Sequence, residues 1–379
     1  MFKTDQKAAG DPFATYKRKK FVWSVLAVAS VLVTVLCVIF ASMFGSSGPI
    51  GPTSLRTISV LDVLRELLNN SLQPVLTFLG FPVQSEESIH KIIVWDIRLP
   101  RILMGGLAGM ALAVSGTIMQ ALFRNPMADP YILGLASGAS VGASFAFIAG
   151  GALGILAGYA IPVFAFCGSL VTVIAVYYIS RVGGTVRVDT LLLSGIALGS
   201  FMAAITSFIT YMSGNFLRPI IFWLMGGLAI AEGNWDNVIL AAVLIIPACL
   251  ICMFFSRSLN LLLLGEETAR YRGLDAQKIQ KVLLILSSLI TGVAVAFTGV
   301  IGFVGLIIPH VMRLITGPDH RVLLPISALW GASFLIIADV IAKTIIYPTE
   351  LPVGIITALC GTPFFLYLLR KRKTTGMIY

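Results

Sequence analysis

The residue types that usually carry out catalysis are few in this sequence and lie far apart. The three histidines are His90, His310 and His320, and their spacing indicates no metal site. We find no Ser/His/Asp set, no HExxH motif and no phosphate-binding loop of the GxxxxGKS or GxxxxGKT type. The chain is therefore not expected to bind ATP by that route, and the sequence predicts no catalytic residue and no metal site.

The five cysteines all lie in apolar runs, which argues against a disulfide framework. Cys249 and Cys252 are three residues apart and could share one face of a helix. Buried free cysteine is a common packing residue, so we favour packing over metal binding or redox chemistry at this pair.

The polar residues that remain form three groups, and the first is a turn between two apolar runs. The stretch from 115 to 139 contains Arg124, Pro126, Asp129 and Pro130. Two prolines four residues apart cannot both lie inside one continuous helix without breaking its hydrogen bonds. Asp129 directly before Pro130 fits an N-cap followed by proline at the first helical position. The pattern predicts a helix end, a polar turn and a new helix start.

The second group is the segment from 261 to 275, which reads LLLLGEETARYRGLD. Its charges are mixed, and Gly265 and Gly273 interrupt it. The pattern predicts one or two short helices outside the membrane that could dock another protein. A solvated loop is the competing interpretation.

The third group is basic and lies on the predicted outer face. It consists of Arg98 and Arg101 in the sequence RLPR, and of Lys343 near the outer end of a later apolar run. Long basic side chains at such places can snorkel to the membrane surface without any partner. They can also form an electropositive rim that attracts an acidic partner. The residues alone favour neither interpretation.

The composition shows which elements must position these groups. Of the 379 residues, 58% are hydrophobic and only 12% are charged, whereas soluble chains carry about 25% charged residues. The apolar runs are continuous, which excludes the alternating pattern of a transmembrane barrel. The sequence therefore predicts an all-α polytopic membrane protein. Its net charge of +10 reflects Lys and Arg in cytoplasmic loops rather than nucleic-acid binding.

A helix needs about 20 apolar residues to cross a bilayer, and about ten segments of the chain qualify. The predicted spans are 21–43, 99–122, 131–149, 155–180, 189–212, 235–256, 279–299, 303–316, 322–346 and 353–369. The segment 303–316 is short for a crossing. The segment 216–230 is apolar but broken by Pro219, and we count it as a half-helix.

Basic clusters at both ends of the chain predict two cytoplasmic termini and an even number of crossings in a cell membrane. The predicted organisation is a cytoplasmic tail (1–20), a transmembrane domain (21–370) and a second cytoplasmic tail (371–379). Within the domain, 45–97 is an outer loop and 257–278 a cytoplasmic loop. Apolar residues at helical spacing predict an amphipathic helix on the outer surface, formed by Leu55, Ile58, Leu61, Leu64 and Leu68.

The chain resembles the FecCD-type permeases, which are subunits of ABC importers for iron–siderophore complexes, haem and vitamin B12. The resemblance runs from about residue 98 to 369. The motifs that carry it are RLPR (98–101), SGTIMQALFRNPMADPYILG (115–134), WLMGG (223–227), LGEETARYRGLD (264–275), GFVGLIIPHVMR (302–313), DHRVLLPISALWGA (319–332), AD (338–339) and ELPVGIITALCGTPFF (350–365).

This resemblance implies the permease fold of type II ABC importers, with ten spans in each subunit of a homodimer. It implies two ATPase subunits on the cytoplasmic side and a substrate-binding protein outside. ATP would be bound and hydrolysed by the ATPase, so this chain would be no enzyme and would hold no cofactor. The cargo would be an iron(III)–siderophore, haem or cobalamin complex.

The resemblance also implies roles for particular residues. The residues expected to couple the permease to the ATPase are Gly265, Glu266, Glu267, Ala269, Arg270 and Gly273. Arg98, Arg101 and Lys343 are expected to dock the binding protein, with lysine at the last position in place of the family's arginine. The span 189–212 is expected to line the pathway, and within it we single out Ser194, Thr206 and Ser207.

The alternative is an ion-coupled secondary transporter of a small organic or metal-chelate solute. Such a transporter normally places ionisable residues in mid-span for ion or proton coupling. Asp339 is the best candidate for that role in this sequence.

Overall fold

The computed structural model describes residues 12–44, 58–78, 89–149, 158–182, 185–186, 188–231, 233–346 and 349–375. Within these residues seven helices are long and apolar enough to cross a membrane, and three shorter apolar helices accompany them. These helices lie in the ten places predicted from hydropathy. The all-α polytopic membrane fold is confirmed.

The helices and strands follow one another along the chain with a single small hairpin among them. In order they are α1 (Pro12–Met43), α2 (Val60–Phe78), α3 (Ile89–Lys91), the π-helix η1 (Ile92–Arg98), α4 (Leu99–Leu122), η2 (Pro130–Leu133), α5 (Leu135–Ala149), α6 (Ala160–Ile179), β1 (Arg181–Val182), β2 (Thr185–Val186), α7 (Val188–Met212), η5 (Gly214–Phe216), α8 (Leu217–Leu224), η6 (Ala229–Ala231), α9 (Trp235–Phe254), α10 (Ser256–Leu263), α11 (Glu266–Tyr271), α12 (Ala276–Thr298), α13 (Val304–Thr316), α14 (His320–Thr344) and α15 (Val353–Thr375). The strands β1 and β2 pair antiparallel.

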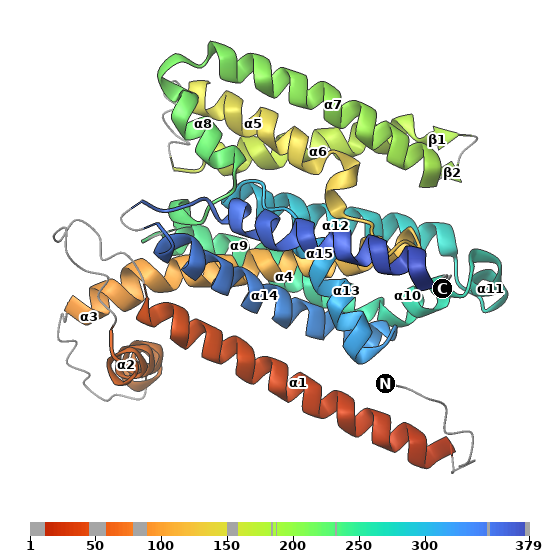
Figure 1. Cartoon of the computed structure of the whole chain (residues 1–379), viewed down its shortest axis with the longest axis horizontal. Helices are drawn as coiled ribbons and strands as arrows, with labels where there is room; N and C mark the ends of the chain where they lie inside the picture. The colour runs from red at the N-terminus through yellow and green to blue at the C-terminus, as the bar shows by residue number, and fades with distance from the viewer. Residues whose placement is uncertain are drawn as a thin grey trace.

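The long helices lie roughly side by side, so the bundle has two distinct ends (Figure 1). One end carries α10, α11, the β1–β2 hairpin, the start of α1 and the end of α15, and we call it the α11 end. The other carries α2, α3 and α8, and we call it the α8 end. Figure 1 also shows α7 on the outside of the bundle, where it packs against α5 and α6.

The helix α4 forms the centre of the bundle. All of its residues are buried except Leu103 and Met110, which are half-buried. It packs against α14, α12, α13 and α9. A helix that is apolar on every side is the expected form for one surrounded by other helices in a membrane.

Glycine lets the backbone of α4 approach two of its neighbours closely. A methyl group at Gly109 would overlap the carbonyl group of Gly331 in α14, and one at Gly116 would overlap the backbone of Gly305 in α13. Lipid tails are as apolar as leucine, so helices in a bilayer associate through close packing of this kind. The small-residue spacing in the sequence therefore reflects contacts at the core of the fold.

A short π-helix leads into α4 and has an identifiable cause. Proline has no N–H, and its ring clashes with the carbonyl four residues before it. Pro100 is the second residue of α4, and the preceding turn widens so that the N–H of Leu99 donates to the carbonyl of Val94, five residues back. This turn sets the direction in which Arg98 and Arg101 leave the helix.

The segment predicted as a crossing at 303–316 forms a shorter element. The helix α13 has 13 residues and is therefore about 20 Å long, less than the roughly 30 Å of the hydrocarbon core. The non-helical residues 299–303 precede it, and Phe303 adopts a left-handed backbone with φ +69°. Irregular backbone at membrane depth is tolerated where protein buries it, and here the hydroxyl of Tyr131 donates to the carbonyl of Ile301 at 2.9 Å.

The predicted amphipathic helix in the 45–97 loop exists as α2, but its buried face differs from the predicted one. Ile58 just before the helix and Val63 are buried, whereas Leu61 is 78% and Leu68 58% exposed. Leu55 lies outside the described residues. The predicted tails are also partly helical, because α1 begins at Pro12 and α15 continues to Thr375.

The close contact of Gly116 with α13 can be tested with two alanine substitutions in the same helix. Gly116→Ala should lower the free energy of unfolding by about 3 kcal/mol, because overpacking against backbone cannot be relieved by a rotamer change. Gly106→Ala is the matched control, since its methyl would meet side chains alone, the nearest being the end of Ile336 at 3.4 Å. Thermal unfolding in detergent measures both, and equal stability of the two variants would contradict the packing argument.

Candidate functional site

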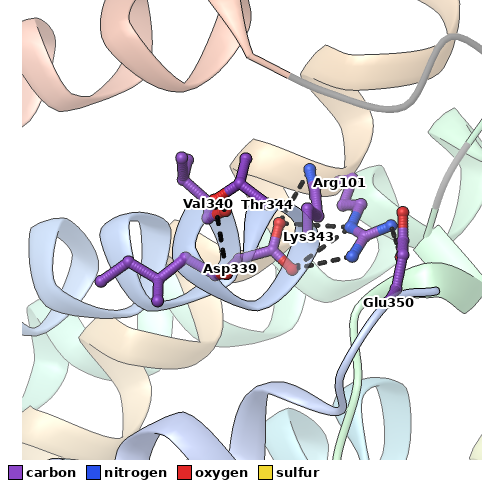
Figure 2. A network of polar contacts seen from close by, with 7 residues as sticks. Arg101, Asp339, Val340, Lys343, Thr344 and Glu350 are labelled. Atoms are coloured by element: carbon purple, nitrogen blue, oxygen red, sulfur yellow. Dashed lines mark hydrogen bonds and ion pairs between the residues drawn. The ribbon is translucent and has the colours of Figure 1, made fainter. Parts of the chain in front are cut away.

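Four charged side chains form a buried cluster near the α8 end of the bundle (Figure 2). Arg101 of α4 donates from Nη2 to Asp339 Oδ1 at 3.0 Å and from Nη1 to Glu350 Oε2 at 2.8 Å. Lys343 Nζ lies 2.9 Å from Asp339 Oδ2, one helical turn along α14. We call Arg101, Asp339, Lys343 and Glu350 the ionic quartet.

The quartet is electrically balanced, with two positive and two negative groups. The side chains of Arg101, Asp339 and Lys343 are only 3–4% exposed, and that of Glu350 is 27% exposed. Taking charges out of water costs several kcal/mol each, and the mutual attraction offsets this only with good geometry. The Arg101 guanidinium meets that condition, because its Nε and Nη2 both donate to Asp339.

Arg98 lies three residues before Arg101 in the chain but performs a separate structural task. Its Nη1 donates to the carbonyl oxygens of Ser42 at 2.7 Å and Met43 at 3.0 Å, at the last turn of α1. The last carbonyls of a helix have no partner within it, and they carry partial negative charge that a cation stabilises. Arg98 therefore caps α1 and ties it to the start of α4.

The three basic residues of the predicted outer face are buried and do not form an exposed rim in this structure. Arg98, Arg101 and Lys343 are 2%, 3% and 5% exposed, and each contacts acceptors within the chain. Snorkelling is excluded for the same reason. Docking of a partner by these residues stays a prediction, and reversing their charges would disrupt the chain's own ion pairs before it could report on docking.

A cavity of about 580 Å³ lies against the quartet, within the range of about 300–1,000 Å³ that is typical of small-molecule sites. Arg101, Asp339 and Glu350 form part of its wall. The rest is mainly apolar and comes from α8, residues 227–229 and residues 351–353, with one residue each from α5 and α6. The Arg218 guanidinium also lines it, 5.5 Å from the ring centroid of Phe222. In the described part of the chain, no group of three or more His, Cys, Asp or Glu side chains could hold a metal ion.

The three hydroxyl residues singled out in α7 do not share one face of the helix. Thr206 is buried and its hydroxyl donates to the carbonyl of Met202, while Ser207 is exposed and donates to Ala203. Ser194 is half-buried. None of them lines the cavity. Their role in a pathway stays a prediction.

The predicted coupling segment forms two short helices at the α11 end. Gly265 and Gly273 both have positive φ, +111° and +81°, which explains why glycine bounds α11 on each side. Ala269 is fully buried, and Glu266 accepts a hydrogen bond from Gln280 of α12 at 2.9 Å. These four residues shape the segment and attach it to the bundle.

The exposed surface of this segment consists of other side chains. Glu267 and Arg270 point into solvent among the predicted residues. Two apolar side chains that the sequence argument missed join them, because Tyr271 is 91% and Leu264 61% exposed. The sequence did contain a signal for them, namely an aromatic residue and a leucine in a charged segment outside the membrane. Exposed apolar side chains in such a place mark a surface that contacts another protein.

The polar turn at 123–129 joins α4 to η2 as predicted. The Asp129 side chain accepts a hydrogen bond from the backbone N–H of Tyr131 at 2.8 Å, and Pro130 follows as the first residue of η2. The turn also contacts α13, where Gln120 donates to the carbonyl of Leu306 and accepts from Arg313 at 2.8 Å. Desolvation among these elements raises the pKa of Asp129 to about 6, although the hydrogen bond from Tyr131 opposes the shift.

The charge balance of the quartet predicts unequal effects of neutralising its two acids. Asp339→Asn should lower the free energy of unfolding by about 3–5 kcal/mol, because it leaves Arg101 and Lys343 buried with one remaining acid. Glu350→Gln is the control and should cost about 1 kcal/mol, since Arg101 keeps Asp339 and position 350 is partly exposed. Unfolding in detergent measures both, and a larger loss for Glu350→Gln would contradict the assignment.

The raised pKa of Asp129 predicts a stability that depends on pH. A folded pKa of about 6 against 3.8 stabilises the fold below pH 4, and this contribution is lost as the pH rises through 6. Asp129→Asn keeps the N-cap acceptor and removes the charge. At pH 8 the free energy of unfolding of this variant should therefore exceed that of the wild type by up to about 3 kcal/mol. At pH 5 the difference should be about half as large, because the carboxyl is ionised in the unfolded chain at that pH but still mostly protonated in the folded one.

Asp275→Asn is the matched control for this experiment. Asp275 is the N-cap of α12 at the same end of the bundle, accepts from the N–H of Lys278 at 3.1 Å and is exposed. Asparagine and aspartate are similar N-caps, so its effect should be under about 0.5 kcal/mol at both pH values. Between pH 5 and pH 8 the wild type should lose stability relative to Asp129→Asn. If it does not, burial does not raise the pKa of Asp129 as described.

Residues 33–371 match the FecCD transport family. The chain is 46% identical over 287 residues, 76% of each chain, to the cobalamin import system permease protein BtuC of Halobacterium salinarum. It is 44% identical over 283 residues, 74% of this chain and 84% of its relative, to the hemin transport system permease protein HmuU of Yersinia pestis.

A solved structure described as an inward-facing conformation of a metal-chelate type ABC transporter has a similar fold. It superposes with a TM-score of 0.75 at 27% identity and covers 92% of this chain and 99% of its own. The permease fold expected from the sequence motifs is therefore confirmed. With this match over most of its length and these relatives, the chain belongs to the FecCD transport family.

Proposed function

We propose that this chain is the membrane-spanning subunit of an ATP-driven importer for a large metal chelate. Two copies would form the translocation unit, two ATPase subunits would bind at the α11 end, and a substrate-binding protein would deliver the cargo at the α8 end. ATP hydrolysis would belong to the ATPase subunits, and no covalent step would occur in this chain. Both termini would then be cytoplasmic.

The exposed surface of α11 is the observation that carries this proposal. It offers an acid, a base and an aromatic ring, which are Glu267, Arg270 and Tyr271, outside the apolar helices. Its backbone is held in place by buried Ala269 and by the Glu266–Gln280 hydrogen bond. The helix α11 is thus a polar element with a fixed backbone at one end of a membrane bundle. Such an element is better suited than a solvated loop to contact a soluble protein.

The surface of α7 supports assembly from two copies. It packs against α5 and α6 on one side, and on the other it exposes Leu193, Phe201, Phe208 and Tyr211 at 60–85%. The exposed side chains of a helix at the edge of the bundle can face lipid or a second subunit. Because the resemblance implies a homodimer with this span at the pathway, we assign α7 to the subunit interface.

The relatives suggest the class of cargo. The proteins from Halobacterium salinarum and Yersinia pestis are named for cobalamin and hemin, both metal chelates of a large macrocycle. We propose such a macrocyclic chelate ahead of an iron(III)–siderophore complex. The cavity next to the quartet would form the outer entrance to the pathway, with Arg218 available at its wall to an acidic or polar group of the cargo.

The quartet bears on the alternative, an ion-coupled transporter. Asp339 was the candidate for ion coupling, but its carboxylate is shared between Arg101 and Lys343. A carboxylate bound by two cations is already neutralised, so it offers little to a transported cation. We therefore retain the importer proposal.

Reconstitution in liposomes tests the proposed function. The permease would be combined with the ATPase and the binding protein of the same importer, and uptake of labelled cyanocobalamin, hemin and a ferric siderophore would be measured. Uptake should require ATP, the ATPase and the binding protein together. Uptake driven by an ion gradient without ATP would overturn the proposal.

Replacing the exposed ring of α11 should weaken binding of the ATPase without disturbing the fold. We expect Tyr271→Ala to weaken ATPase binding by at least about ten-fold, because exposed aromatic residues at contact surfaces often contribute 2 kcal/mol or more. The matched control is Gln277→Ala, an exposed residue of α12 at the same end. Pull-down of the ATPase by each purified variant gives the affinities, and an unchanged affinity for Tyr271→Ala would remove α11 from the interface.

A further inference from the structure

The segment α10–α11 is attached to the rest of the bundle by a polar contact that the proposed function does not yet use. Leu259 and Leu262 anchor α10 through buried apolar contacts. Asn260, between them, turns instead toward the beginning of α14. It lies on the segment that we propose contacts the ATPase, and α14 ends 25 residues later at the ionic quartet.

The Asn260 amide uses both of its ends on α14. Its Oδ1 accepts from the backbone N–H of His320 at 2.9 Å and lies 2.8 Å from His320 Nδ1. Its Nδ2 donates to Asp319 Oδ1 at 2.7 Å. The His320 side chain is buried and Asn260 is half-buried, so this contact is partly shielded from water. We call these three hydrogen bonds the Asn260 clamp.

The acceptor of the clamp is held as a carboxylate. Asp319 is the N-cap of α14, and it accepts from the backbone N–H of Arg321 at 3.0 Å. Hydrogen bonds from the Arg321 side chain, and then from Asn260, lower the pKa of Asp319 to about 2. The carboxylate is therefore ionised at any physiological pH, and hydrogen bonds to charged groups are stronger than neutral ones.

The helix α14 can carry a displacement across the bundle. It is about 38 Å long, it approaches the backbone of α4 at Gly331, and its other end bears Asp339 and Lys343. A displacement of α10 moves the first turn of α14 directly, because the clamp contacts backbone as well as side chain. The opposite end of α14 lies at the cavity wall.

We propose that Asn260 is a positioning residue that transmits movement of the α10–α11 segment to α14 and so to the ionic quartet and the cavity. This inference rests on the proposed function, since it names how the same segment acts on the bundle. Asn260 touches neither ATP nor cargo. It acts by fixing the start of α14 to the helix pair that the ATPase displaces.

The test compares transport with ATP hydrolysis in proteoliposomes that contain the full complex. The probe is whichever of cyanocobalamin and hemin the wild type accumulates. In Asn260→Ala we expect the amount transported per ATP hydrolysed to fall by at least about five-fold, the lower end of allosteric coupling. ATP hydrolysis and ATPase binding should stay within about two-fold of the wild type, since the exposed face of α11 is unchanged.

A matched control separates coupling from loss of a cap. Asn234 is the N-cap of α9 near the α8 end, and its side chain accepts from the N–H of Asn237 at 3.0 Å. Asn234→Ala removes a similar capping interaction away from the coupling segment. This control variant should lose about as much thermal stability as Asn260→Ala, but it should keep the wild-type ratio of transport to ATP hydrolysis.

Asn260→Asp is a second test variant that nearly keeps the size of the side chain. It retains an acceptor for the backbone N–H of His320, but it places a second carboxylate against Asp319 in place of the donor. It should uncouple transport as strongly as alanine.

The outcomes separate this inference from the proposed function. A wild type that does not transport with ATP would overturn the proposed function itself. A transporting wild type with an unchanged ratio in Asn260→Ala would overturn the role of Asn260 alone. An equal loss of coupling in Asn234→Ala, or a wild-type coupling ratio in Asn260→Asp, would also count against it.

Discussion

A bilayer offers buried charges almost no water, so the charges inside this bundle must find partners within the chain. The ionic quartet meets this constraint by balancing two cations against two acids across three segments. The arrangement of α4, α14 and the start of α15 follows from it, because moving any one of them would leave a charge uncompensated. The cavity takes part of its polar wall from three of these residues, Arg101, Asp339 and Glu350.

Close packing acts as the second constraint and sets how freely these helices can move. The contacts of Gly109 with Gly331 and of Gly116 with Gly305 bring backbones together without side chains between them. Packed interfaces of this kind are bistable rather than continuously deformable. The helices α4, α13 and α14 therefore move together or shift between discrete arrangements, while α7, packed on only one side, has fewer contacts to break.

The sequence was sufficient to predict the helices, because about 20 apolar residues are needed for each crossing and hydropathy records that requirement directly. The turn at Asp129 was also predictable, since N-capping and proline act locally. The environment of the basic residues was not. Arg101 finds its partners 238 and 249 residues away, and Arg98 caps a helix 55 residues earlier, so nothing near either residue reveals the contact.

Some signals in the sequence were available but ambiguous. Asp339 and Lys343 are four residues apart on one helix, a spacing that favours an ion pair. This spacing would have argued that Lys343 is paired within the chain. The family resemblance favoured a lysine that docks a partner instead. In α2 the spacing predicted a helix correctly, but the same period fits two faces, and only contact with α1 and η1 selects the one that carries Val63.

Polar contacts anchor α14 at both of its ends, and their positions indicate how a displacement would pass along the helix. At one end three hydrogen bonds tie it to α10, and at the other the quartet ties it to α4 and to the segment before α15. Between them its contacts with α4 are small and apolar at Gly331, and Trp330 and Ser333 form hydrogen bonds with Ser30 and Thr34 of α1. A rigid helix held by directional bonds at both ends transmits a shift better than it absorbs one. Because buried ion pairs are costly to break, a shift that reaches the quartet must either carry α4 along with α14 or exchange the partners of Arg101, and both change the wall of the cavity.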